Sequence, residues 1–145
     1  MPTSQHSYTF DTDMELADGA ANTTSSELGQ VDSADKVIDL GSTAGAAFTP
    51  ASLVVDVSAI DFTTGDETYD IMFLLSAVVA MTGAVAKACI PMGDARDNFA
   101  DDTAAGRVVL GVDNEHKGTI YRFAALYVSV TGTTPIINVK AFLSR

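Results

Sequence analysis

The 145-residue sequence contains no tryptophan, one cysteine and two histidines, and these scarcities exclude several kinds of site. The single cysteine, Cys89, cannot form an internal disulfide, and its apolar surroundings in AKACIPM predict a small, buried side chain. His6 and His116 stand far apart in the sequence, so they predict no zinc site. The first residues, MPTSQHSYTF, have no basic stretch followed by an apolar core, and we therefore expect no signal peptide.

Basic residues are also few: 8 Lys and Arg stand against 19 Asp and Glu, which gives a formal net charge of −11 at pH 7. Nucleic-acid affinity comes largely from Lys and Arg that displace counterions, so we expect neither nucleic acid nor an anionic membrane as a partner. Residues 1–40 hold eight acids against Lys36 alone, whereas the last thirty residues hold basic residues and no acid. This asymmetry suits an acidic arm that lies on the basic end of its own fold or of a neighbouring copy; a solvated tail is the alternative.

An uncharged apolar run, IMFLLSAVVAMTGAVA at 71–86, raises the question of a membrane span. As a helix it is too short to cross about 30 Å of hydrocarbon, and Thr82-Gly83 interrupts it with a turn signal. The run therefore predicts a buried strand followed by a loop.

The length is that of one domain with a single core. Residues 1–36 are acidic and rich in small residues, and their apolar side chains are too widely spaced for a continuous strand or helix. These widely spaced residues are Tyr8, Phe10, Met14, Leu16 and Leu28. We expect an extended N-terminal arm at 1–36, with one short strand in it as the alternative to a fully irregular arm, and a folded domain at 37–145.

Alternating apolar residues predict the strands of that domain. The predicted segments are 37–40, 52–62, 69–77, 107–112, 120–130 and 136–144, with one short strand in 83–93. In the first long segment Leu53, Val55, Val57 and Ala59 share one face. The segment IYRFAALYVSV has two apolar faces, one of them with Tyr121, Phe123, Ala125, Tyr127 and Ser129. Turns rich in Gly, Thr and Asp join the segments, so we predict an all-β protein with one β-sandwich or jelly-roll-like domain.

Motifs that carry catalytic chemistry are sparse. GSTAG (41–45) lacks the Lys and the spacing of a phosphate loop and is not a G-x-S-x-G elbow, so it predicts a loop. A carboxylate cluster in GDARDNFADD favours a solvated loop, with a weak cation site or a subunit contact as alternatives. Its acids are Asp94, Asp97, Asp101 and Asp102. A metal-dependent hydrolase would need a histidine cluster, and we expect no catalytic residue, no cofactor and no resident metal.

Arg122 interrupts the second apolar face of IYRFAALYVSV. An arginine near the start of a strand can lay its stem on apolar surface and direct its guanidinium to the sheet edge. We expect a structural ion pair with Asp113 or Glu115 of the preceding turn, or with an acid of the arm. An intersubunit pair is the alternative, and catalysis is the interpretation that we favour least.

Three passages carry a resemblance to a known family: VIDLG (37–41), LVVDVSAIDFTTGDETYDIMFLLS (53–76) and AGRVVLGVDNEHKGTIYRFAALYVSVTGTTPIINVKAFL (105–143). They resemble small structural proteins of tailed bacteriophages, the jelly-roll-like head decoration or cement proteins. The likeness covers about residues 36–145 and is most specific at 114–143. The opening YTFDTDMELADGAA (8–21) is similar to the N-terminal arm of that family.

The resemblance implies a non-enzymatic virion protein, made in the bacterial host cytoplasm, that binds the outer surface of a tailed-phage capsid. It implies homotrimers that bridge neighbouring major capsid subunits and so stabilise the shell. The arm would make many of the contacts, so deletion of residues 1–20 is expected to leave the sandwich folded and to weaken attachment. Our candidate subunit or capsid contacts are Tyr8, Phe10, Asp11, Asp13, Met14, Leu16 and Arg122.

The alternative function is a receptor- or glycan-binding module of a phage tail fibre or spike. Sugar sites commonly use aromatic platforms with polar neighbours, and the missing tryptophan weighs against such a site.

Overall fold

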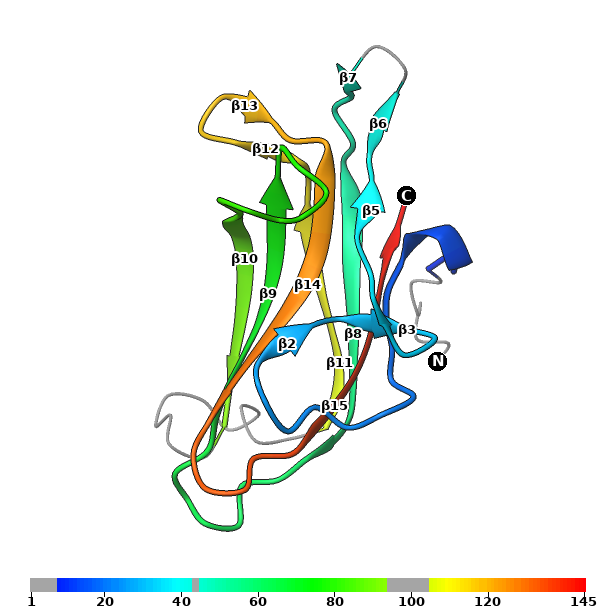
Figure 1. Ribbon diagram of the computed structural model, residues 1–145. Coiled ribbons are helices and arrows are strands. Elements are labelled where there is room, and N and C mark those ends of the chain that lie inside the picture. Colours follow the sequence, from blue (N-terminus) through cyan, green and yellow to red (C-terminus); the bar gives the residue numbers. More distant parts are fainter. Residues whose placement is uncertain (1–7, 43–44, 94–104) are drawn as a thin grey trace.

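The computed structural model describes residues 8–42, 45–93 and 105–145. These residues form β-strands and one short 3-10 helix, η1 (Thr12–Met14). Two antiparallel sheets lie face to face (Figure 1). The predicted all-β sandwich is confirmed.

The first sheet has the order β1–β15–β8–β11. Its strands are β1 (Glu15–Asp18), β15 (Ile137–Ser144), β8 (Ala51–Ile60) and β11 (Gly106–Val112). Leu53, Val55 and Val57 of β8 face the core, as the alternation predicts. Branched side chains at alternate positions favour an extended backbone with one buried face.

A bulge changes the alternation near the end of β8. Asn138 of β15 pairs with Ala59, but Val139 pairs with Val57, so Ser58 is an extra residue on β8. An extra residue reverses which side chains face inward. Ala59 is therefore exposed and the prediction that it faces the core is wrong, whereas Ile60 packs against the core.

The second sheet has the order β10–β9–β14–β2, and β5 pairs with the other end of β14. Its strands are β10 (Val85–Met92), β9 (Thr68–Ser76), β14 (Phe123–Thr131), β2 (Glu27–Leu28) and β5 (Ile38–Asp39). The run at 71–86 is thus a strand, a loop and the start of the next strand, as predicted.

Every connection between the main strands crosses from one sheet to the other, except the hairpin that joins β9 to β10. β2 and β5 both pair with β14 and act as two pieces of one edge strand. When β2 and β5 are counted as one strand, eight strands form two four-stranded sheets with the connectivity of a jelly roll.

Three small hairpins complete the described structure: β3 (Gln30–Val31) with β4 (Ala34–Asp35), β6 (Gly41–Ser42) with β7 (Gly45–Ala46), and β12 (Glu115–His116) with β13 (Thr119–Ile120). The last confirms the turn predicted at NEHKGT. Lys117 and Gly118 at its tip have φ of +50° and +82°, the combination that a tight two-residue hairpin requires.

The core lies between the two sheets. Its largest fully buried side chains include Tyr69, Phe73, Ile71, Leu75 and Leu126. The Tyr69 hydroxyl donates to the Asp61 carbonyl and accepts from the Ile136 amide at 3.0 Å, so the polar atom of this buried ring is satisfied.

Cys89 lies on the outside of β10, and the prediction that it is buried is wrong. The register pairs it with Met72, on the face of the second sheet that points away from the core. Its neighbour Ile90 points inward and is buried. Apolar neighbours in a strand lie on the opposite face, so they do not imply burial of the residue between them.

Candidate functional site

Residues 8–14, which we name the N-terminal segment, lie against the outer face of the first sheet. The Phe10 ring makes an edge-to-face contact with Phe142 at a centroid distance of 5.3 Å, and Lys140 Nζ lies 5.0 Å from the Phe10 centroid. Phe142 and its partner Val54 occupy outward positions of the sheet, yet they are 4% and 0% exposed. The segment thus lies on its own sheet, one of the two placements predicted for the acidic arm.

The next residues form the helix η1 and remain accessible. Asp11 caps it: its Oδ1 accepts from the Asp13 amide at 2.9 Å, and its carbonyl accepts from the Met14 amide at 3.0 Å. Met14 packs against the core, while both aspartates are exposed. A cavity of about 170 Å³ lies here, lined by Thr9, Asp11, Met14, Leu143 and Arg145. Tyr8, Phe10, Asp11 and Asp13 thus stay accessible to a partner.

Leu16 is part of the core, with 0% of its surface exposed, and it is therefore not a surface contact. β1 carries it and pairs with β15, where Glu15 lies opposite Phe142. β2 and β5 likewise join the second sheet. β1, β2 and β5 therefore belong to the sandwich, and the predicted boundary at residue 36 does not separate an arm from a domain. A strand of four residues with one large apolar side chain carries too weak an alternation to be recognised in sequence.

Arg122 forms a two-pronged ion pair with Asp39. Nε lies 2.8 Å from Oδ1 and Nη2 lies 2.8 Å from Oδ2, and the guanidinium carbon is 5.3 Å from the centroid of the Phe123 ring. The predicted ion pair is confirmed, but both predicted turn partners are wrong. Asp113 pairs with Lys87 at 3.0 Å, and Glu115 accepts from the Gly118 amide at 2.6 Å. The reason is sheet register, because β5 places Asp39 opposite Phe123.

We expect the Arg122→Gln substitution to raise the pKa of Asp39. Arg122 donates to the carboxylate and lowers the pKa of Asp39 from 3.8 to about 2, with a smaller effect from the Gly41 amide. A pKa that is lowered in the folded state stabilises the protein above pH 3.8, and this contribution is lost as the pH falls toward 2. Carbon-detected NMR titration of the side-chain carboxyl measures the change.

The matched control for this substitution is Arg107→Gln. Arg107 forms the same kind of pair with Asp56, with Nε 2.6 Å from Oδ1 and Nη2 2.8 Å from Oδ2. This variant should leave the pKa of Asp39 near 2. An Asp39 titration that is the same in both variants and the wild type would show that Arg122 does not set it.

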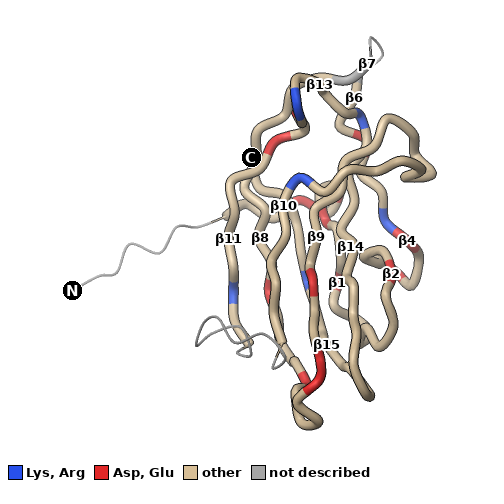
Figure 2. The backbone as a smooth tube through the Cα atoms, turned by 90° about the vertical axis from the view of Figure 1, so that its left-hand side faces the viewer, with Lys and Arg blue, Asp and Glu red and all other residues tan. Residues whose placement is uncertain are grey.

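The outer face of the second sheet carries apolar side chains. By register these are Met72 and Leu74 of β9 and Phe123, Ala125 and Tyr127 of β14, and we name these five residues the apolar face. β9 and β14 contain one charged residue, Asp70. Figure 2 marks the charged residues along the backbone. The outer face of the first sheet instead carries Arg107, Asp56 and Lys140 in one row. The sequence signal for the apolar face is the face of IYRFAALYVSV that carries Phe123, Ala125 and Tyr127, for which the sequence predicted no role.

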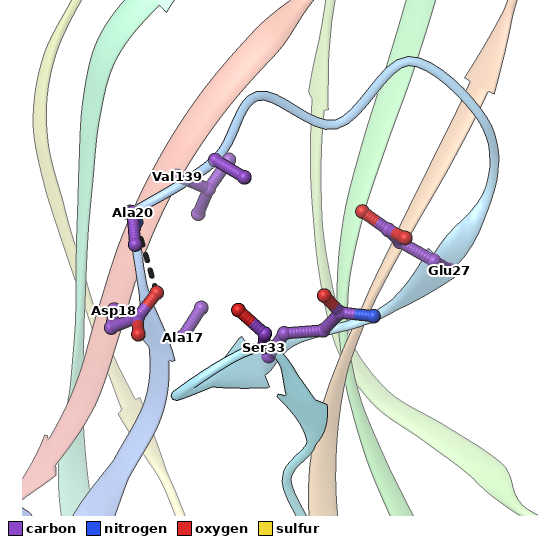
Figure 3. A pocket seen from close by; sticks show the side chains of 9 residues that line it. Ala17, Asp18, Ala20, Glu27, Ser33 and Val139 are labelled. Carbon is purple, nitrogen blue, oxygen red and sulfur yellow. Dashed lines mark hydrogen bonds between the residues drawn. The ribbon is translucent and has the colours of Figure 1, made fainter.

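A smaller hollow of about 40 Å³ lies beside β1 (Figure 3). Asp18 at its wall accepts from the Ala20 amide and the Asp32 amide, each at 2.9 Å. These bonds lower the pKa of Asp18, the Ala20 bond more than the Asp32 bond. Glu27 and Ser33 lie on the other side of the hollow. The volume suits one or two water molecules, and Asp18 serves to hold two turns together.

Little in the described residues resembles a reactive centre. Within 8–42, 45–93 and 105–145, no group of three or more His, Cys, Asp or Glu side chains is placed to hold a metal ion. The same residues include no helix with the length and hydropathy to cross a membrane. The cluster of Asp94, Asp97, Asp101 and Asp102 lies outside the described residues, as does His6.

Comparison with models of known families, with curated proteins and with solved structures finds no match. The class of protein defined by the fold is a single jelly-roll domain with one apolar outer face.

Proposed function

We propose that this chain is a non-enzymatic structural protein of a virion, which binds the outer surface of a tailed-phage capsid and bridges neighbouring major capsid subunits. The observation that carries the proposal is the unequal covering of the two sheets. Phe10 of the N-terminal segment covers the first sheet at Phe142. The apolar face of the second sheet receives no such ring contact from the described residues. Ala125 is buried and the other four side chains are half-buried, and the charged neighbours of the face are Asp70 and the Arg122–Asp39 pair. Apolar side chains on a flat surface gain free energy when a protein partner excludes water from them.

The size of the apolar face suits weak contacts that are repeated many times. The five residues lie on two strands spaced about 4.8 Å apart, over about five residues at about 3.3 Å each, so the apolar face spans roughly 160 Å². A typical stable interface buries about 800 Å² on each partner, so one such contact is weak. A lattice that presents many sites to an oligomer converts weak contacts into firm attachment. Homotrimers are therefore part of the proposal, as the resemblance to decoration proteins implies.

The charge of the chain supports an outer position. At −11, the protein is repelled by packaged DNA, whereas the outer surface of a shell imposes no such penalty. Tyr8, Phe10, Asp11 and Asp13 stay in the proposal as further contacts, because their side chains are accessible. The proposal places synthesis in the cytoplasm of the bacterial host.

Copies of the chain per purified particle, measured by quantitative mass spectrometry against the major capsid protein, test the proposal. Wild-type particles should hold one copy per capsid subunit or a regular fraction of it. Met72→Glu places a charge on the apolar face and should reduce the copy number at least tenfold, because the carboxylate must be desolvated on contact.

The control is Val79→Glu, which adds the same charge at a loop position that is 62% exposed and should leave the copy number unchanged. Circular dichroism of both purified variants checks that they fold. A dozen copies or fewer per wild-type particle would favour the fibre or spike alternative, and complete absence from particles would overturn the proposal. Full occupancy by Met72→Glu would instead remove the apolar face from the contact.

A further inference from the structure

Two loops meet at one end of the sandwich. The β8–β9 loop contributes Asp66, whose carboxylate accepts from the Thr133 amide at 3.0 Å and from the Thr133 hydroxyl at 2.8 Å. Thr133 belongs to the β14–β15 loop. Gly93, at the end of β10, lies directly against the backbone of Glu67. Asp66 and Glu67 are thus held by contacts from two other parts of the chain.

Glu67 is a carboxylate with 0% of its surface exposed. Its Oε1 accepts from the Thr64 amide at 3.3 Å and from the Thr64 hydroxyl. Its Oε2 is buried and has no hydrogen-bond partner within the part of the chain that the structure describes. Burial of a carboxylate oxygen without a hydrogen-bond donor or a positive charge costs free energy, so we expect a ligand at Glu67 Oε2.

The oxygen acceptors around Glu67 outnumber the N–H and O–H hydrogens that can be donated to them. The Thr64 hydroxyl lies within hydrogen-bond reach of Glu67 Oε1, of Asp66 Oδ1 at 2.8 Å and of the Thr133 carbonyl at 3.1 Å. One hydroxyl hydrogen serves only one of these three oxygens at a time. In the described ranges, neither Asp66 nor Glu67 forms an ion pair with Lys or Arg. The hydrogen bond from the Thr64 hydroxyl lowers the pKa of Glu67.

We propose that Glu67 and Asp66 bind a hard divalent cation, Ca²⁺, between the two loops. Glu67 Oε2 is the ligand that the fold leaves without a partner. The Asp66 carboxylate, the Thr64 hydroxyl and the Thr133 carbonyl supply further oxygens, and water completes the shell. Oxygen ligands around Ca²⁺ with bonds of 2.3–2.6 Å lie about 3 Å from one another, similar to the separations around Thr64 Oγ1. Irregular loop oxygens suit Ca²⁺ better than Mg²⁺, which requires near-ideal octahedral geometry.

Binding of this ion would join the β8–β9 loop to the β14–β15 loop. A ligand that binds only the folded state stabilises it in proportion to the logarithm of its concentration above Kd. The site thus makes the stability of this end of the sandwich respond to the Ca²⁺ concentration.

The test uses the full chain, stripped with a chelator and titrated with CaCl₂, while KCl holds the ionic strength constant. We expect calorimetry to show one Ca²⁺ per wild-type chain and the melting temperature to rise with added CaCl₂. Glu67→Gln keeps the shape of the side chain and removes its charge, and it should weaken Ca²⁺ binding at least tenfold and abolish the thermal response. The matched control Glu27→Gln makes the same charge change on β2 and should bind Ca²⁺ like the wild type.

Two results would overturn the proposal. A wild-type chain whose heat of titration and melting temperature do not respond to CaCl₂ would show that a proton or a buried water satisfies Glu67 Oε2. An equal response in the wild type and Glu67→Gln would show general binding to an acidic surface. If Glu67→Gln does not fold, Asp66→Asn replaces it, because the Asp66 side chain is exposed and its removal disturbs the core less.

Discussion

Replacement of Gly93 by alanine should lower the free energy of unfolding by about 3 kcal/mol or more. Gly93 has φ of +117°, a conformation that an L side chain rarely adopts, and its added Cβ would lie 2.4 Å from the Glu67 carbonyl oxygen and 2.8 Å from Thr68 Cα. Both neighbours are backbone atoms of β9 and the loop before it, so they cannot move aside as a flexible side chain would. A typical domain is stable by only about 5–15 kcal/mol, so this loss is large. Urea unfolding followed by circular dichroism measures it.

Two other glycines separate the causes of that loss. Gly83 also has a positive φ, +68°, but an added Cβ would meet nothing within 4 Å, so Gly83→Ala should cost only about 1 kcal/mol. Gly111 has neither a positive φ nor a neighbour within 4 Å, and Gly111→Ala should change stability by less than about 0.5 kcal/mol. Equal losses for Gly93→Ala and Gly83→Ala would show that the close approach to Glu67 is unimportant.

Leu16→Ala should destabilise the protein by about 3 kcal/mol, within the range of about 2–5 kcal/mol seen for buried leucines. The Leu16 side chain is 0% exposed and belongs to the core cluster between the sheets. Its truncation removes apolar contacts and leaves a cavity that the paired strands β1 and β15 can fill only in part. Chemical unfolding at pH 7 gives the difference from the wild type.

The control for Leu16→Ala is Leu28→Ala on β2. Leu28 lies opposite Tyr127 on the outer side of the second sheet and is only half-buried, so this variant should lose about 1 kcal/mol or less. If both variants lost equally little stability, residues 15–18 would be a dispensable arm after all.

The burial of Leu16 also changes the expectation for the deletion of residues 1–20, which should now unfold or strongly destabilise the sandwich.

Several elements could be predicted from local patterns. Alternating branched side chains identify β8, β9, β14 and β15, because a strand with one face against a core repeats every two residues. The turn at Lys117-Gly118 follows in part from Gly118, which tolerates positive φ. These features depend on residues that are close in sequence, so they can be predicted before the fold is known.

Other features depend on residues that only the fold brings together. Asp39 contacts Arg122, 83 positions away, because β5 pairs with β14 at the edge of the second sheet, beside β2. Burial of Glu67 has the same kind of origin. Residues 63–68, TTGDET, have the composition of an exposed turn, but Gly93 and Thr133 pack against this loop.

The sequence by itself determined the class of fold, the main strands and the acidic character of the protein, because these follow from composition and from a period of two residues. Only the tertiary structure decided that β1 is a core strand, that Ala59 and Cys89 face outward, and that one sheet keeps an apolar outer face. The reason is physical: the face on which a side chain lies is set by strand register, bulges and the segments that pack above it. Those are contacts between distant parts of the chain, and no local pattern encodes them.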